Sequence, residues 1–140
     1  FVKRYDQTNY TTEFAYRETY KSELEKMKKA SPASEFVIFT DMAHVIRIKT
    51  YLKNPNYFDA YERSIREIID VFGQVKSFHL ENDFTSKDKY WLDFYHFYPE
   101  VGDKMIHSLE TGEGEGSFYV NVNETNVDQY MSDLKKLVNE

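Results

Sequence analysis

The sequence predicts an α+β fold: helices pack on one face of a curved antiparallel sheet of about five strands, and N-terminal and C-terminal helices flank it. Apolar residues recur at helical spacing in some segments and alternate with polar residues in others. Short connections join the alternating segments. Successive strands are therefore expected to be antiparallel neighbours, because a parallel pair needs a longer crossover.

The first predicted helix covers residues 12–30. Its apolar residues follow one another at spacings of four, four and three and form one stripe: Tyr16, Tyr20, Leu24 and Met27. Residues 36–39 are wholly apolar and predict a short strand after this helix.

Residues 45–52 predict a second strand, because polar and apolar side chains alternate there. The side chains expected to face the core are Ile46 and Ile48. Those expected to face outward are Arg47, Lys49 and Tyr51.

The clearest helix begins at Pro55 or Tyr57 and ends at Phe72. It has a wide apolar stripe, Asn54 or Asn56 is suited to cap its start, and Gly73 stands where a left-handed residue often ends a helix. The later segments, in order, are a strand at 75–80, a polar loop at 82–89, a strand at 90–98, a strand or short helix at 103–111, an acidic turn at 112–116, a strand at 118–123 and a last helix from 127.

The strand predicted at 90–98 contains six aromatic residues and the only tryptophan. With a side-chain period of two, one face carries Tyr90, Leu92, Phe94, His96 and Tyr98. The other face carries Trp91, Asp93, Tyr95 and Phe97. The carboxylate in the second set assigns that set to the outer face of the sheet.

The outer face therefore combines aromatic, cationic and acidic groups, a composition suited to recognition of another protein. The predicted partner-binding residues are Trp91, Tyr95, Phe97, Asp93, Arg47, Lys49, Tyr51, Tyr119, Glu113 and Glu115. In the alternative, the first helix covers Trp91 and Phe97 and leaves no site there.

The histidines provide no catalytic or metal site in this interpretation. None of His44, His79, His96 and His107 has the i,i+4 spacing of a helical metal site. Asp93 could orient His96 as a general base, but residues three apart on a strand point to opposite faces. The two side chains are therefore not expected to meet unless a bulge intervenes.

Composition limits the functional classes. The formal net charge of −6 disfavours nucleic-acid binding and favours a protein partner with a basic surface. The absence of cysteine excludes disulfides and thiolate sites, and no cofactor is expected. The longest apolar run, residues 36–39, is too short to insert into a membrane.

The 140 residues predict one domain, 1–140, in which residues 1–11 are disordered or form a linker. A first residue of Phe1 is compatible with a removed signal or anchor, so the compartment is not readable. The abundance of Lys, Asn, Tyr, Phe and Ile suggests a microbial source.

These observations predict a non-enzymatic protein-binding domain, such as an inhibitor or a toxin-neutralising immunity protein that acts by occlusion. The alternative is a small-ligand-binding cone, of cystatin-like or nuclear-transport-factor-2-like architecture, with an aromatic-lined and even enzymatic pocket. No motif of either family is present. In that case the cavity would be lined by Tyr90, Phe94, His96 and Tyr98. A homodimer that buries the aromatic face is a third alternative.

Overall fold

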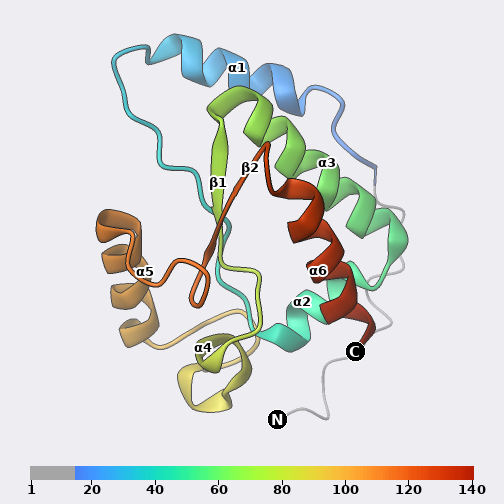
Figure 1. Cartoon of the computed structure of the whole chain (residues 1–140), viewed down its shortest axis with the longest axis vertical. Coiled ribbons are helices and arrows are strands. Elements are labelled where there is room, and N and C mark those ends of the chain that lie inside the picture. Colours follow the sequence, from blue (N-terminus) through green and yellow to red (C-terminus); the bar gives the residue numbers. More distant parts are fainter. Residues whose placement is uncertain (1–14) are drawn as a thin grey trace.

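The computed structural model describes residues 15–140, and most of them are helical (Figure 1). The helices are α1 (Tyr20–Ala30), α2 (Val45–Leu52), α3 (Pro55–Phe72), α4 (Asp83–Ser86), the 3-10 helix η3 (Asp88–Tyr90), α5 (Pro99–Thr111) and α6 (Val127–Asn139). The strands are β1 (Gln74–Ser77) and β2 (Val120–Asn123). The predicted sheet of about five strands is therefore wrong: the described residues contain one two-stranded antiparallel sheet. The expectations for residues 1–11 and for residues 12–14 of the first predicted helix lie outside the described residues. Residues 15–19 are not helical, so the prediction of a helix there is wrong, and α1 begins at Tyr20.

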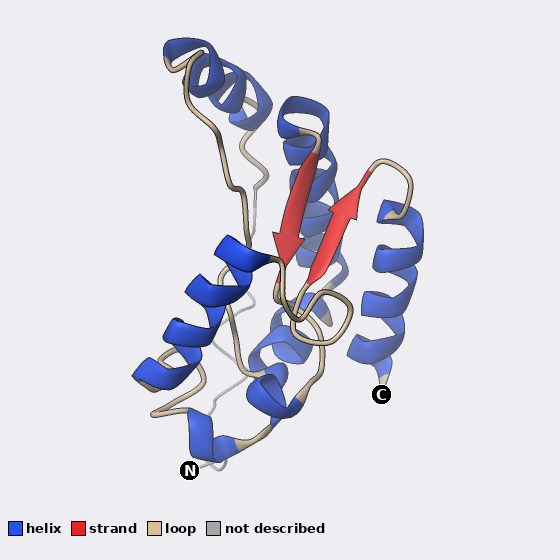
Figure 2. Ribbon diagram, turned by 60° about the vertical axis from the view of Figure 1, so that its left-hand side comes forward, coloured by secondary structure: helices blue, strands red, loops and turns tan. Residues whose placement is uncertain are grey.

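The two strands lie side by side (Figure 2), and Val75 of β1 is opposite Val122 of β2. The predicted strand at 36–39 is reduced to a short parallel bridge beside β1. Thr40 N–H donates to the Lys76 carbonyl at 3.0 Å, and Lys76 N–H donates to the Ile38 carbonyl at 2.9 Å. The chain segments that follow this bridge and β1 consequently leave the sheet at the same edge.

Two apolar cores lie on opposite faces of the sheet. In Figure 1, α3 and α6 lie on one side of the strands and α5 lies on the other. Val75 and Val122 are fully buried against α3 and α6, whereas Phe78 and Tyr119 pack in the second core with α5. Within the described residues, no helix combines the length and apolar content that crossing a bilayer requires.

The strand predicted at 45–52 is wrong, because these residues form α2. Val45, Ile48 and Leu52 are buried, and their spacings of three and four place them on one helical face. The Nδ1 atom of His44 accepts a hydrogen bond from Ile46 N–H at 3.2 Å and caps the helix. Alternation over eight residues was compatible with both periods, and the cap and the buried face favour the helix.

The helix predicted at 55–72 is confirmed as α3. The Asn54 side chain accepts from Asn56 N–H at 3.0 Å, and Gly73 ends the helix with φ 87°. The last predicted helix is confirmed as α6, and the ambiguous segment at 103–111 belongs to α5. These helices have strong local signals: a wide apolar stripe in α3 and α6, and a proline in the first turn of α5.

The strand predicted at 90–98 is also wrong. Only Trp91 and Phe97 form a bridge, and they belong to one tight loop whose ends meet. Leu92 N–H donates to the His96 carbonyl at 2.7 Å, and Tyr98 N–H donates to the Tyr90 carbonyl at 2.9 Å. The polar loop expected before it contains α4 and η3.

Candidate functional site

The loop at 90–98 turns at Asp93. One carboxylate oxygen of Asp93 accepts backbone N–H bonds from Tyr95 at 2.7 Å and from His96 at 2.8 Å. Aspartate commonly stabilises a turn in this way, by accepting from the backbone two or three residues ahead. The turn brings Asp93 and His96 to the same side of the loop.

Asp93 and His96 form a hydrogen-bonded pair, which corrects the expectation that they point apart. The second Asp93 oxygen lies 2.7 Å from His96 Nδ1. The hydrogen bond from His96, aided by the two backbone bonds, lowers the pKa of Asp93, so the carboxylate is ionised. An ionised carboxylate can only accept, so Nδ1 is the donor in this contact. In the tautomer with a single ring proton on Nδ1, Nε2 is an acceptor.

The other three histidines also contact carboxylates, but their settings differ. His79 uses both ring nitrogens, with Asp41 and with the Tyr61 hydroxyl. His44 likewise uses both, with Asp88 and with the Ile46 amide. His107 pairs at 3.0 Å with Glu113, an exposed carboxylate beside the glycine-rich turn. Among the four, only His96 combines an unbonded ring nitrogen with a partner that the backbone holds in place.

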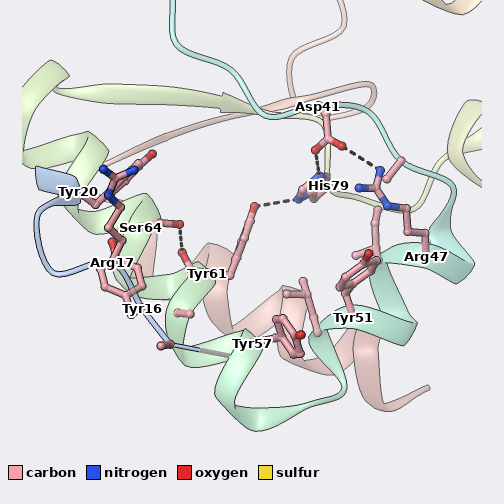
Figure 3. Close-up of a pocket in the computed structure, with 15 residues that line it drawn as sticks. Tyr16, Arg17, Tyr20, Asp41, Arg47, Tyr51, Tyr57, Tyr61, Ser64 and His79 are labelled. Atoms are coloured by element: carbon pink, nitrogen blue, oxygen red, sulfur yellow. Dashed lines mark hydrogen bonds and ion pairs between the residues drawn. The ribbon is translucent and has the colours of Figure 1, made fainter. Parts of the chain in front are cut away.

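A cavity of about 540 Å³ lies close to this loop, at the sheet edge where residues 38–40 and β1 end (Figure 3). In α/β sheets, ligands commonly bind outside the carboxyl ends of parallel strands. Most of its wall consists of tyrosine rings and aliphatic side chains from α2, α3 and the segment leading into α1. The aromatic lining residues are Tyr16, Tyr20, Tyr51, Tyr57 and Tyr61.

A polar corner of the cavity is built around Asp41. Its carboxylate accepts from His79 Nε2 at 3.0 Å and from the Arg47 guanidinium at 2.9 Å (Figure 3). The hydrogen bond from His79 lowers the pKa of Asp41 to about 2, against the opposing effect of burial. His79 Nδ1 then accepts from the Tyr61 hydroxyl, which lies 2.8 Å from the Tyr130 hydroxyl. Asp41 is thus a permanent carboxylate at the end of a fixed network.

Arg47 connects the cavity to the loop that carries the pair. Its guanidinium carbon lies 4.5 Å from the centre of the Tyr95 ring and 5.5 Å from that of Tyr51. The Tyr95 ring lies 6.4 Å from the ring of His96. One arginine therefore stands between Asp41 in the cavity and the residues next to His96.

Two predicted partner-binding residues are buried, and a third is half-buried. Trp91 is only 6% exposed, and its indole N–H donates to the Phe84 carbonyl at 2.6 Å. Phe97 is half-buried with its ring edge-on to Trp91, and Tyr119 is 1% exposed. Residues of its own loop and His44 cover Trp91. The first helix, α1, which was the alternative cover, packs against α3 instead.

The structure brings together Asp93, Tyr95, Arg47 and Tyr51 from the predicted set. Lys49 is on the same helix as Arg47, and its ammonium lies 3.7 Å from the carboxylate of Glu81. The remaining two acidic residues, Glu113 and Glu115, are exposed in the turn after α5, where Glu113 contacts His107.

Sequence reasoning missed Asp41 and His79 as neighbours and rejected the pairing of Asp93 with His96. Asp41 lies just beyond the apolar segment at 36–39, and His79 lies just beyond β1. Parallel pairing of these two segments would have predicted that the two side chains meet. For the second pair, the signal was an aspartate that can form its own turn three residues before a histidine.

Within residues 15–140, no group of three or more histidine and acidic side chains is arranged to hold a metal ion. Comparison of the chain with known family models, curated proteins and solved structures found no match. The assignment of function therefore depends on the geometry of the site.

Proposed function

We propose that this chain is a hydrolytic enzyme in which His96, oriented by Asp93, acts as the general base. The observation that carries the proposal is the 2.7 Å contact between His96 Nδ1 and Asp93, with the carboxylate fixed by two backbone amides. A histidine held in this way by a carboxylate is the acid–base part of many hydrolytic sites. The proposal departs from the non-enzymatic function predicted from sequence, because a turn removes the objection to this pair.

Water is the nucleophile that the described residues favour. No serine, threonine or tyrosine hydroxyl among residues 15–140 is hydrogen-bonded to His96. The His96 side chain is 72% exposed, so water and a substrate can both reach Nε2. A carboxylic ester suits this arrangement, because its carbonyl carbon accepts attack by water once a base removes a proton.

The proposed reaction begins when the water oxygen attacks the ester carbonyl carbon and its proton passes to His96 Nε2. Asp93 stabilises the imidazolium that results, because it is an ionised carboxylate in contact with Nδ1–H. The imidazolium then returns the proton to the alcohol oxygen as the C–O bond breaks. The histidine ends the cycle neutral and in the same tautomer.

The test is hydrolysis of 4-nitrophenyl acetate by the wild-type chain and by matched histidine variants. We expect His96→Asn to lower kcat/KM by about 10²-fold or more, the usual contribution of a general base. His107→Asn is the control, because His107 is also exposed and also pairs with a carboxylate. Equal rates for wild type and the His96 variant would refute the proposal, as would an equal loss in the control.

Binding of another protein remains a second proposal, and exposed apolar side chains on the same loop favour it. Leu92 is 53% exposed and Tyr98 is 40% exposed. An inhibitor or immunity protein would use such side chains as anchors for a partner with a basic surface. Capture of a partner identified by mass spectrometry should be lost when Leu92 and Tyr98 are replaced by alanine, with Ile106→Ala as the control. Undiminished capture would exclude this loop.

A further inference from the structure

We infer that the cavity at the Asp41 edge of the sheet binds a single uncharged sugar ring. The cavity is distinct from the Asp93–His96 pair, and the inference concerns binding alone. It therefore does not depend on His96 acting as a base. Its volume of about 540 Å³ lies within the range of about 300–1,000 Å³ usual for small-molecule sites.

The walls of the cavity are formed by tyrosine rings and by aliphatic side chains. Tyr57 and Tyr61 come from α3 and Tyr20 from α1, and all three line the cavity (Figure 3). Ile48 and Leu52 add aliphatic surface from α2. Tyrosine rings present apolar faces with polar tips, so the walls suit a ligand that is itself apolar on its faces and polar at its edges.

The polar corner has no free charge to offer a ligand. Asp41 is ionised, but the guanidinium of Arg47 balances it at 2.9 Å. The other arginine on the wall, Arg17, pairs with Glu23 at 2.9 Å. A charged ligand would have to displace one of these ion pairs, so the corner favours a neutral molecule over an anion or a cation.

The same corner retains hydrogen-bonding capacity. A carboxylate can accept about four hydrogen bonds, and two positions on Asp41 are used by His79 and Arg47. Neighbouring hydroxyl groups of a ligand could donate to the remaining positions while its C–H face lies on a tyrosine ring. A purely apolar ligand would leave these polar groups without water and without partners, which is unfavourable.

A sugar ring meets each of these conditions, because it carries no charge, has C–H faces and bears hydroxyl groups on adjacent carbons. The test is a ¹H–¹⁵N NMR titration with D-glucose, D-galactose, D-mannose and N-acetyl-D-glucosamine. We expect at least one to bind in the millimolar range and to shift the amides of Ala43, Ile48 and Ser64, which line the cavity. Acetate, tetramethylammonium and 1-hexanol are the anionic, cationic and apolar comparison probes.

The variant Asp41→Asn should weaken sugar binding at least about tenfold, since it removes a charged acceptor. Its side chain is exposed enough for the substitution to leave the fold intact, and Asp83→Asn on α4 is the matched control. His96→Asn should bind sugar as wild type does, which separates failure of this inference from failure of the catalytic proposal. The inference is overturned if no sugar shifts these amides, if Asp41→Asn binds normally, or if a comparison probe binds more tightly.

Discussion

Replacing Trp91 by alanine separates a core role for this residue from a surface role. Its indole is 6% exposed, and a buried tryptophan removes about 150–250 Å² from water. At about 25 cal/mol per Å², that area corresponds to about 4–6 kcal/mol, and measured losses for Trp→Ala in cores are about 3–5 kcal/mol. We expect Trp91→Ala to lower the free energy of unfolding by about 3–5 kcal/mol and the Tm by roughly 10–15 °C.

The assay is guanidinium unfolding followed by far-ultraviolet circular dichroism, which does not depend on the tryptophan signal. Trp91→Phe keeps a ring but loses the N–H that bonds to the Phe84 carbonyl, so its loss should be smaller, about 1–3 kcal/mol. Leu92→Ala, at an exposed position of the same loop, should stay within about 0.5 kcal/mol of wild type. A loss below about 1 kcal/mol for Trp91→Ala would refute the core assignment and restore the predicted surface role.

Two further predictions concern pH and backbone conformation. Burial lowers the pKa of His44, against the opposing hydrogen bond to Asp88, so the unfolded chain binds the proton more readily. The stabilisation is complete above the ordinary histidine pKa of about 6.5 and is lost as the pH falls below it. Denaturation midpoints between pH 8 and pH 5 should therefore fall more steeply for wild type than for His44→Asn, which keeps a capping side chain; parallel curves would contradict this. Gly73→Ala should lower the free energy of unfolding by about 1–2 kcal/mol, because Gly73 has φ 87°, and an unchanged value would show that this helix end relaxes.

Helix α2 shows which part of a structure local sequence predicts and which part tertiary packing determines. Residues 45–52 fit a strand through Ile46 and Ile48, and they fit a helix through Val45, Ile48 and Leu52. Over eight residues, the spacing of apolar side chains does not distinguish the strand period of two from the helical period of about 3.6. Packing of the helical face against α3 and α6, together with the cap from His44, decided it.

The loop at 90–98 shows a second limit of prediction from the spacing of apolar residues. A period of two assigned Trp91 and Tyr95 to one face, but the structure buries Trp91 and exposes Tyr95. The turn at Asp93 breaks the alternation, because its carboxylate binds the amides of Tyr95 and His96 in place of a strand neighbour. The pairing of Asp93 with His96 depends on that turn and could not follow from strand geometry.

The sequence by itself determined α3 and its end at Gly73 and narrowed its cap to Asn54 or Asn56, because each signal is contained within a few neighbouring residues. It also determined the last helix, through the spacing of its apolar residues. Only the tertiary structure decided which strands exist and which side chains meet. Asp41 and His79 are 38 positions apart and touch because two chain segments run parallel into one edge of the sheet. Contacts of that kind depend on the whole packing arrangement, which no local pattern encodes.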